Sequence, residues 1–326
     1  MRPIIYGILA SFFFAFTFVL NRAMDVAGGH WIWSASLRYI FMVPFLFLIV
    51  AKRSSLTKLF SHMRSYPGSW VLWSFTGFVL FYAPLSFAAA YGPGWLIAGT
   101  WQVTIIAGSL LVPLFYERIT TPNGTIRVRG KLPLKGLFLS CIILVGVAVM
   151  QIEHAKSISQ AALLLGILPV VLAAFAYPLG NRKMMEVCGE DIDAYQRVLG
   201  MMLASMPFWL LLAGIGWVVA GPPSMGQTMQ SIVVAVSSGV IATILFFAAT
   251  DMVRGDTHKL AAVEATQSGE VLFALLGEIL ILSTPLPTFW SWIGMLLVVL
   301  GMVLHSFYSH GPATKKSPSI MPEKAT

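Results

Sequence analysis

The chain has 326 residues, of which 57% are hydrophobic and 10% charged, with a mean hydropathy of +0.81 and a net charge of +8. Soluble domains are about 45–50% apolar and about 25% charged, so this composition excludes a water-soluble fold and an intrinsically disordered chain. The basic residues fall between apolar runs rather than on one soluble face, which argues against a nucleic-acid partner.

Ten apolar runs are long enough to cross a hydrocarbon core of about 30 Å, which needs roughly 20 helical residues. In chain order they cover residues 4–20, 31–51, 70–90, 95–116, 134–151, 161–180, 195–220, 230–250, 260–281 and 287–309. We therefore predict an all-α integral membrane protein with ten transmembrane helices. The first run is predicted to be a membrane helix rather than a cleaved signal peptide. Residues 310–326 are predicted to form a disordered cytoplasmic tail.

The lysine and arginine residues indicate how these helices are oriented, because cytoplasmic loops carry an excess of both. With a cytoplasmic N-terminus, all of the 21 basic residues fall on the cytoplasmic side except Arg22, Arg38 and Lys156. Both chain termini are therefore predicted to be cytoplasmic, and the membrane topology accounts for most of the positive charge.

Two stretches of the chain, residues 1–151 and 161–309, resemble each other and predict a pair of five-helix repeats. The matching positions are Gly7-Ile8-Leu9 with Gly166-Ile167-Leu168, Asn21-Arg22 with Asn181-Arg182, Arg38 with Arg197, and Gln102 with Gln267. The asparagine-arginine pairs are predicted to end the first helix of each repeat. Five is an odd number, so the two repeats would insert with opposite orientations. Inverted repeats are typical of secondary transporters, whose substrate sites lie near the midplane.

Several stretches resemble the drug/metabolite transporter superfamily, whose members have ten helices in paired EamA-like domains. They are Gly7-Ile8-Leu9 through Asn21-Arg22, Trp31 to Tyr39, Trp101-Gln102 and Gly277-Glu278. Within that superfamily the chain is similar to the multidrug resistance efflux transporter family. The resemblance implies a small-molecule substrate and a location in the bacterial plasma membrane. In the small relatives an acid in the first helix binds drug and proton, but the runs 4–20 and 161–180 hold no acid.

The run 260–281 supplies the acids that the first helices lack. Glu270 follows Leu260 by about 15 Å at 1.5 Å per residue, which places it at the midplane of the hydrocarbon core. Glu264 is shallower, and Gln267 lies between the two on one broad polar face. Burial of a carboxyl group favours its protonated form, so Glu270 and Glu264 are the predicted proton-coupling residues. The alternative for each is a structural pair with an arginine.

The predicted substrate-binding residues are Gln102, Gln267, Trp101, Tyr177 and Arg38, and Arg197 is the predicted gate. Amides can bond either a substrate or another helix, and aromatic rings can bind cations or simply pack. The two arginines can bind an anion, pair with the glutamates or extend to the lipid headgroups. We find no metal-binding or catalytic motif, so neither a metal, a cofactor nor enzymatic activity is predicted.

These observations predict a secondary active transporter that exports small amphipathic or cationic compounds in exchange for protons. Its partners would be the substrate, protons and the lipid bilayer, and a homodimer is left open. Two alternatives stay open as well. One is an exporter or exchanger of an anionic or zwitterionic metabolite held by Arg38 or Arg197, and the other is a membrane scaffold that transports nothing.

Overall fold

The computed structural model describes residues 1–121, 124–132, 134–157, 159–254 and 256–309, and most of these are helical. The first half of the chain forms α1 (Arg2–Val26), α2 (Trp31–Arg53), α3 (Leu56–Ser65), α4 (Pro67–Ser74), η1 (Phe75–Val79), α5 (Leu80–Ala88), η2 (Ala89–Tyr91), α6 (Gly94–Trp101), α7 (Val103–Leu110), η3 (Val112–Leu114) and α8 (Leu134–Ser157). Segments α4 to η2 form one long helix, as the unbroken helical assignment from Pro67 to Tyr91 indicates.

The second half of the chain is helical as well. It forms α9 (Gln160–Cys188), α10 (Ala194–Ala220), α11 (Met225–Val234), η4 (Ala235–Ala242), α12 (Thr243–Asp251), α13 (Thr257–Ala265), η5 (Thr266–Ser268), α14 (Gly269–Leu282) and α15 (Phe289–Ser309). Segments α11 to α12 form a second long helix.

Seven helices in the described part of the chain are long and apolar enough to cross a membrane. They are Arg2–Val26, Trp31–Arg53, Pro67–Tyr91, Gln160–Cys188, Ala194–Ala220, Met225–Asp251 and Ala262–Leu282. Shorter apolar helices cover Gly136–Met150 and Phe289–Leu304. Nine of the ten predicted runs overlap these helices, whereas the fourth run, 95–116, is covered by the shorter segments α6, α7 and η3. The chain is a multi-pass membrane protein in composition and length.

One detail of the sequence prediction is wrong, and one element was missed. The fourth run ends as helix at Leu114, and the chain then forms an antiparallel hairpin of β1 (Tyr116–Thr121) and β2 (Gly124–Arg129). The Asn123-Gly124 dipeptide between β-branched residues was the available hairpin signal. Helix α3 was also not predicted. The predicted tail, residues 310–326, lies outside the described residues.

The asparagine-arginine pairs do not end their helices, because α1 continues to Val26 and α9 continues to Cys188. A basic residue at the end of an apolar run is a common signal for the last turn of a helix. Here Arg22 is bonded within the helix to Asp25 at 2.8 Å, and Arg182 is buried against an acid of another helix. Both charges are therefore compensated without leaving the helix.

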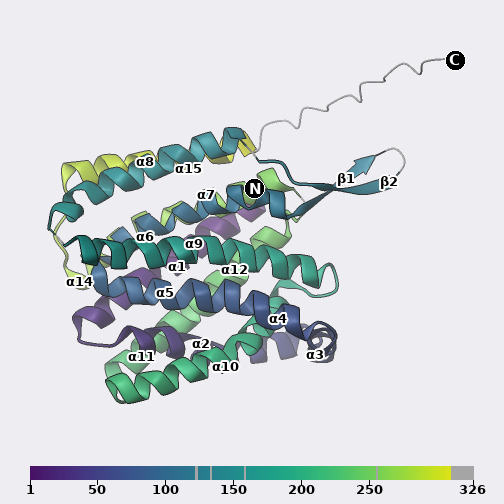
Figure 1. Cartoon of the computed structure of the whole chain (residues 1–326), viewed down its shortest axis with the longest axis horizontal. Coiled ribbons are helices and arrows are strands. Elements are labelled where there is room, and N and C mark those ends of the chain that lie inside the picture. The colour runs from purple at the N-terminus through teal and green to yellow at the C-terminus, as the bar shows by residue number, and fades with distance from the viewer. Residues whose placement is uncertain (122–123, 133, 158, 255, 310–326) are drawn as a thin grey trace.

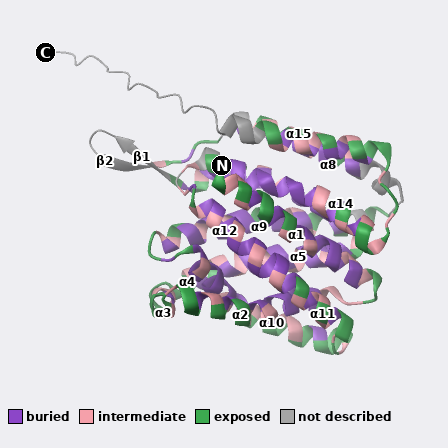
Figure 2. Cartoon of the chain, turned by 180° about the vertical axis from the view of Figure 1, so that it is seen from behind, coloured by how far each residue is buried: buried purple, intermediate pink, exposed green. Residues whose placement is uncertain are grey.

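The helices run alongside one another, with α8 and α15 packed together at one edge and α2 packed against α10 near the other (Figure 1). Buried residues face the inside of the bundle, whereas exposed ones follow its outer faces (Figure 2). Many exposed side chains on α10 and α15 are large and apolar, such as Leu211, Val218 and Leu296. An apolar outer surface of this kind suits contact with hydrocarbon rather than water.

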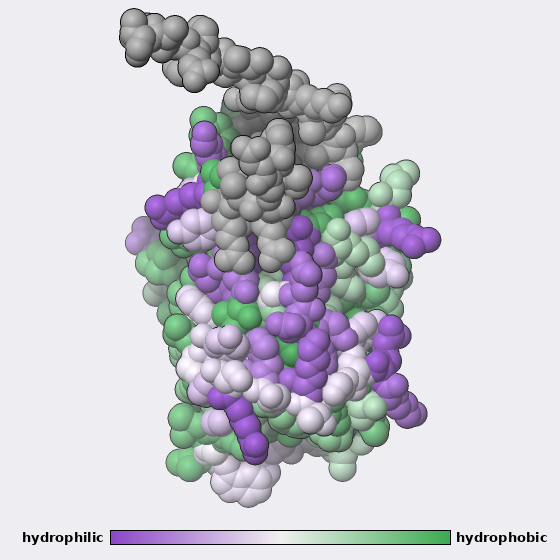
Figure 3. Space-filling model, turned by 90° about the vertical axis from the view of Figure 1, so that its right-hand side faces the viewer, coloured by the Kyte–Doolittle hydropathy of each residue, from purple (hydrophilic) through white to green (hydrophobic). Residues whose placement is uncertain are grey.

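One end of the bundle differs from these flanks. The N-terminus, α3 and the β1–β2 hairpin lie at the same end (Figure 1). Seen from that end, hydrophilic side chains gather over the middle of the face, and hydrophobic side chains lie toward its sides (Figure 3). This end therefore has the polar character expected at a membrane surface.

Irregular helical segments recur at corresponding places in the two halves. The π-helical segment η1 interrupts the helix Pro67–Tyr91, and η4 interrupts Met225–Asp251. Helix α1 packs against η4, whereas α9 packs against η1. At the α9–η1 contact the backbones of Gly180 and Gly77 touch, so that a Cβ atom on Gly180 would overlap Gly77 and lie 2.9 Å from the Trp73 carbonyl oxygen.

This contact gives a test of the packing. We expect Gly180→Ala to lower the melting temperature in detergent, because overpacking typically costs about 1–3 kcal/mol. Gly214→Ala on α10 is the matched control, since a Cβ atom there meets nothing within 4 Å. The control should be neutral or stabilising because alanine favours helix over glycine. Equal melting temperatures for the two variants would contradict the close contact between α9 and η1.

Candidate functional site

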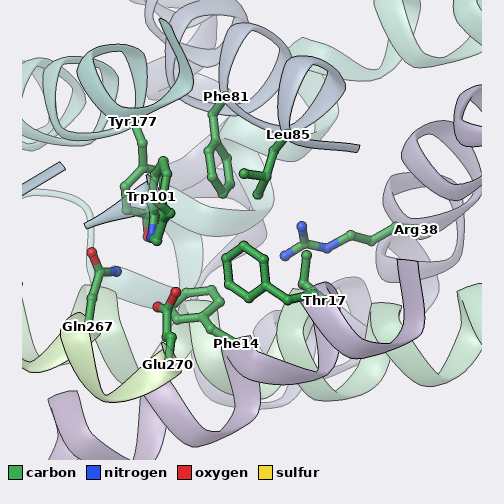
Figure 4. A pocket seen from close by; sticks show the side chains of 10 residues that line it. Phe14, Thr17, Arg38, Phe81, Leu85, Trp101, Tyr177, Gln267 and Glu270 are labelled. Atoms are coloured by element: carbon green, nitrogen blue, oxygen red, sulfur yellow. The ribbon is translucent and has the colours of Figure 1, made fainter. Parts of the chain in front are cut away.

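One cavity lies in the centre of the described bundle, where helices from both halves meet (Figure 4). Its walls come from α1, α2, α5, α6, α9, η5 and α14. The lining side chains are Phe14, Thr17, Phe18, Arg38, Phe81, Leu85, Trp101, Tyr177, Gln267 and Glu270. The space left between them is about 10 Å³. A single water molecule needs about 10–15 Å³ of such space, so the cavity is nearly closed in this conformation.

Two interrupted helices cross beside the cavity. Helical structure changes at Gln102, between α6 and α7, and again at η5, which contains Gln267. The side-chain amide of Gln102 donates to the carbonyl oxygens of Ala98 at 2.9 Å and Gln267 at 3.2 Å. Gln102 thus joins the two interrupted helices, whereas Gln267 and Trp101 line the cavity itself.

Glu270 extends into the cavity from the first turn of α14 (Figure 4). Glu270 is 1% exposed, and neither of its carboxyl oxygens has a hydrogen-bond partner among the described residues. The Tyr177 hydroxyl, on the opposite wall, also lacks a partner in the described part of the chain. A carboxylate removed from water without a cation or hydrogen bonds is costly, so this group needs a proton or a ligand.

Arg38 enters the cavity from α2, on the other side from Glu270 (Figure 4). Its Nη2 donates to the Ser238 hydroxyl at 3.0 Å, and its guanidinium carbon lies 3.9 Å from the centre of the Tyr82 ring. Ser238 is in turn bonded to the Thr17 hydroxyl. The Arg38 Nε and Nη1 atoms have no hydrogen-bond partner within the described residues.

Glu264 does not line the cavity, because it forms a buried ion pair with Arg182 of α9. Arg182 Nε donates to Glu264 Oε1 at 3.0 Å and Nη2 donates to Oε2, while Nη1 donates to the Gly108 carbonyl oxygen at 2.6 Å. This contact ties together α7, α9 and α13.

Sequence reasoning missed Arg182 by counting it among the cytoplasmic charges. A usable signal existed in the sequence, because one helix face is formed by Tyr177, Asn181, Met184, Met185 and Cys188. The structure buries all five of these residues. That spacing indicates that the helix continues past Arg182 against the protein interior.

Arg197 lies outside the cavity as well. Its Nη1 donates to Asp251 at 2.6 Å and its Nη2 to the Phe247 carbonyl oxygen at 3.4 Å, and Asp251 also accepts from Arg254. Arg38 and Arg197 are 2% and 0% exposed, so neither extends to the lipid headgroups. Neither arginine is paired with Glu264 or Glu270 among the described ion pairs.

Comparisons with known proteins agree with this architecture. A family model named EmrE and described as "Putative multidrug resistance efflux transporter" matches residues 1–311. "Uncharacterized protein YjlA" of Bacillus subtilis (strain 168) is 60% identical over 316 residues, which cover 97% of this chain and 98% of the relative. A 42.1 kDa protein of Shouchella clausii is 52% identical over 270 residues, covering 83% of this chain and 70% of the relative.

One solved structure, described only as "Crystal structure of protein", has a similar fold. It superposes with a TM-score of 0.65 over 95% of this chain and 100% of its own, at 12% sequence identity. That likeness concerns the fold alone. The family match over nearly the whole chain and the apolar helices decide the identity: the chain belongs to the multidrug resistance efflux transporter family of the drug/metabolite transporter superfamily, a family of membrane transporters.

Proposed function

We propose that the chain is a secondary active transporter of the plasma membrane that exports small amphipathic or cationic compounds in exchange for protons. The central cavity is its substrate site, and Glu270 is the residue that carries the proton. The observation that carries this proposal is the position of Glu270, a fully buried carboxyl group without a partner among the described residues, in a cavity walled by aromatic rings.

The proposed topology is ten spans in two inverted five-helix repeats, residues 1–151 and 161–309, with both termini in the cytoplasm. Matched irregularities support it, since η1 and η4, and likewise the interruptions at Gln102 and Gln267, occupy corresponding places in the two halves. The reciprocal contacts of α1 with η4 and of α9 with η1 support it too. Inverted repeats place a substrate site at their interface, where the cavity lies.

Coupling follows from competition at a single carboxyl group. Burial without a counter-ion favours the protonated Glu270, whereas an incoming ammonium group favours the ionised form. Proton and cationic substrate then occupy the site in alternate turns, which links their fluxes through one shared residue. Trp101 and Tyr177 line the cavity together with Glu270. The faces of aromatic rings attract cations.

Two ion pairs would close the cytoplasmic side of the cavity. In the proposed topology, the Arg182–Glu264 and Arg197–Asp251 pairs both lie in the cytoplasmic half of the bundle. Because its charge is already compensated by Arg182, Glu264 contributes by holding α9 to α13 rather than by carrying the proton. Arg197 keeps its proposed gating role, with Asp251 as its partner.

The topology is tested by labelling single cysteines in a chain whose Cys141 and Cys188 are replaced by alanine. We expect a membrane-impermeant maleimide to label Gly28→Cys and Leu286→Cys in intact cells. Ser65→Cys and Lys131→Cys should be labelled only after the membrane is opened. All four positions are exposed, so the accessible side of the membrane decides the result. Labelling of Lys131→Cys in intact cells would overturn the inverted arrangement.

The coupling mechanism is tested by substrate flux in proteoliposomes with and without an imposed pH gradient. We expect Glu270→Gln to fold and insert but to lose gradient-driven flux, because an amide of the same size cannot release a proton. Glu278→Gln on the same helix is the matched control. Glu278 accepts a hydrogen bond from the Gly94 amide at 2.6 Å, outside the cavity, and a glutamine oxygen can accept the same bond. Wild-type gradient-driven flux in Glu270→Gln would refute the mechanism.

A further inference from the structure

The buried charges of this bundle can be accounted for one by one. Within the described residues, the charged residues buried in the fold are Arg38, Arg182, Arg197, Glu264, Glu270 and Glu278. Arg182 is paired with Glu264, Arg197 is paired with Asp251, and Glu278 accepts a backbone hydrogen bond from Gly94. The other two, the cation Arg38 and the acid Glu270, have neither an ionic partner nor a backbone hydrogen bond among these residues, and both line the same cavity.

Arg182 shows what a satisfied buried arginine looks like in this protein. All three of its guanidinium nitrogen atoms donate to oxygen atoms, two of them on a carboxylate. At Arg38 one nitrogen donates to a hydroxyl group, and the Nε and Nη1 donors are unused within the described structure. The Tyr82 ring face stabilises the charge of Arg38 but accepts no hydrogen bond from Nε or Nη1. Arg38 therefore retains the capacity to bind an anion.

The cavity separates the two uncompensated groups. Arg38 and Glu270 come from α2 and α14 and point into the cavity from opposite sides (Figure 4), and they form no ion pair among those found in the described residues. Apolar and aromatic side chains, including Phe14, Phe81 and Leu85, line the same cavity. A small ligand that carries an anionic group, a cationic group and an apolar side group would match all three features.

We propose that the substrate of this cavity is a small zwitterion of amino-acid size. Its carboxylate binds the free N–H donors of Arg38, its ammonium group binds Glu270 beside Trp101, and its apolar side group packs against the phenylalanine rings. This inference rests on the proposed function, because it names the substrate class of the same site and leaves the proton exchange at Glu270 unchanged.

The test is equilibrium binding to the purified full-length protein in detergent at one fixed pH. One probe series is phenylalanine, phenethylamine, which lacks the carboxylate, and 3-phenylpropionate, which lacks the ammonium group. A second series is leucine, isopentylamine and 4-methylpentanoate. A hydrogen bond to a charged group is worth about 1.5–3 kcal/mol, so in at least one series the zwitterion should bind about 10- to 100-fold more tightly than either analogue.

Variants assign each end of the ligand to its residue. Arg38→Gln should reduce the affinity for the zwitterion to that for the amine while leaving the amine affinity unchanged, which also shows that the variant is folded. Glu270→Gln should reduce the zwitterion affinity to that of the acid. Arg22→Gln is the control, because Arg22 is paired with Asp25 and does not line the cavity. Its preference for the zwitterion should equal that of the wild type.

If no series shows tighter binding of the zwitterion, or if Arg38→Gln weakens amine and zwitterion equally, the proposal is wrong. That failure is distinct from a failure of the proposed function. Gradient-driven flux that depends on Glu270, together with equal binding of amine and zwitterion, would reject the zwitterion alone. Gradient-driven flux that survives Glu270→Gln would reject the coupling mechanism, whatever the binding series shows.

Discussion

A charge that is removed from both water and lipid headgroups must be neutralised by a partner, a proton or a ligand, and this constraint organises the interior of the bundle. Taking an ion out of water costs several kcal/mol even after relaxation, so unpaired buried charges are rarely retained without a use. Arg182 and Glu264 satisfy the rule with each other, and Arg197 satisfies it with Asp251. Arg38 and Glu270 have no ionic partner among the described residues. A ligand in the cavity that both line can supply the missing charges.

The helix irregularities give this cavity its walls. A regular helix offers no free backbone groups, whereas an interrupted helix frees some of them and changes the direction of its side chains. At Gln102 and Gln267 the interrupted helices are bonded to each other, which fixes the wall that holds Trp101 and Glu270. Where η1 meets α9, contact between Gly77 and Gly180 brings the helices close together beside Tyr177. The contacts that shape the site are thus contacts between the two halves of the chain.

The amino-acid sequence predicted much of this architecture and the central acid. Most of the apolar runs fell on long helices because membrane helices must be long and apolar regardless of their partners. Depth along the helix was enough to single out Glu270, since rise per residue is nearly constant. Trp101, Tyr177, Arg38 and Gln267 were also among the predicted site residues, and all of them line the cavity.

What could not be predicted was which charges are paired. Arg182 and Glu264 are far apart in the chain, and only the packing of α9 against α7 and α13 brings them together. Gln102 was predicted as a substrate ligand on its sequence correspondence with Gln267, yet its amide is used to join the interrupted helices. The β1–β2 hairpin was not predicted, because the fourth apolar run was expected to continue as helix to residue 116. These features depend on tertiary contacts rather than on local composition.

The central claim is that Glu270 exchanges a proton for a cationic ligand, and proton release on binding tests it most directly. The measurement adds phenylalanine or phenethylamine to purified protein in weakly buffered detergent solution, and it follows the pH as the ligand binds. The account predicts release of about one proton per bound ligand from the wild type and none from Glu270→Gln. Equal proton release from the wild type and Glu270→Gln, or ligand binding to the wild type without any release, would contradict it.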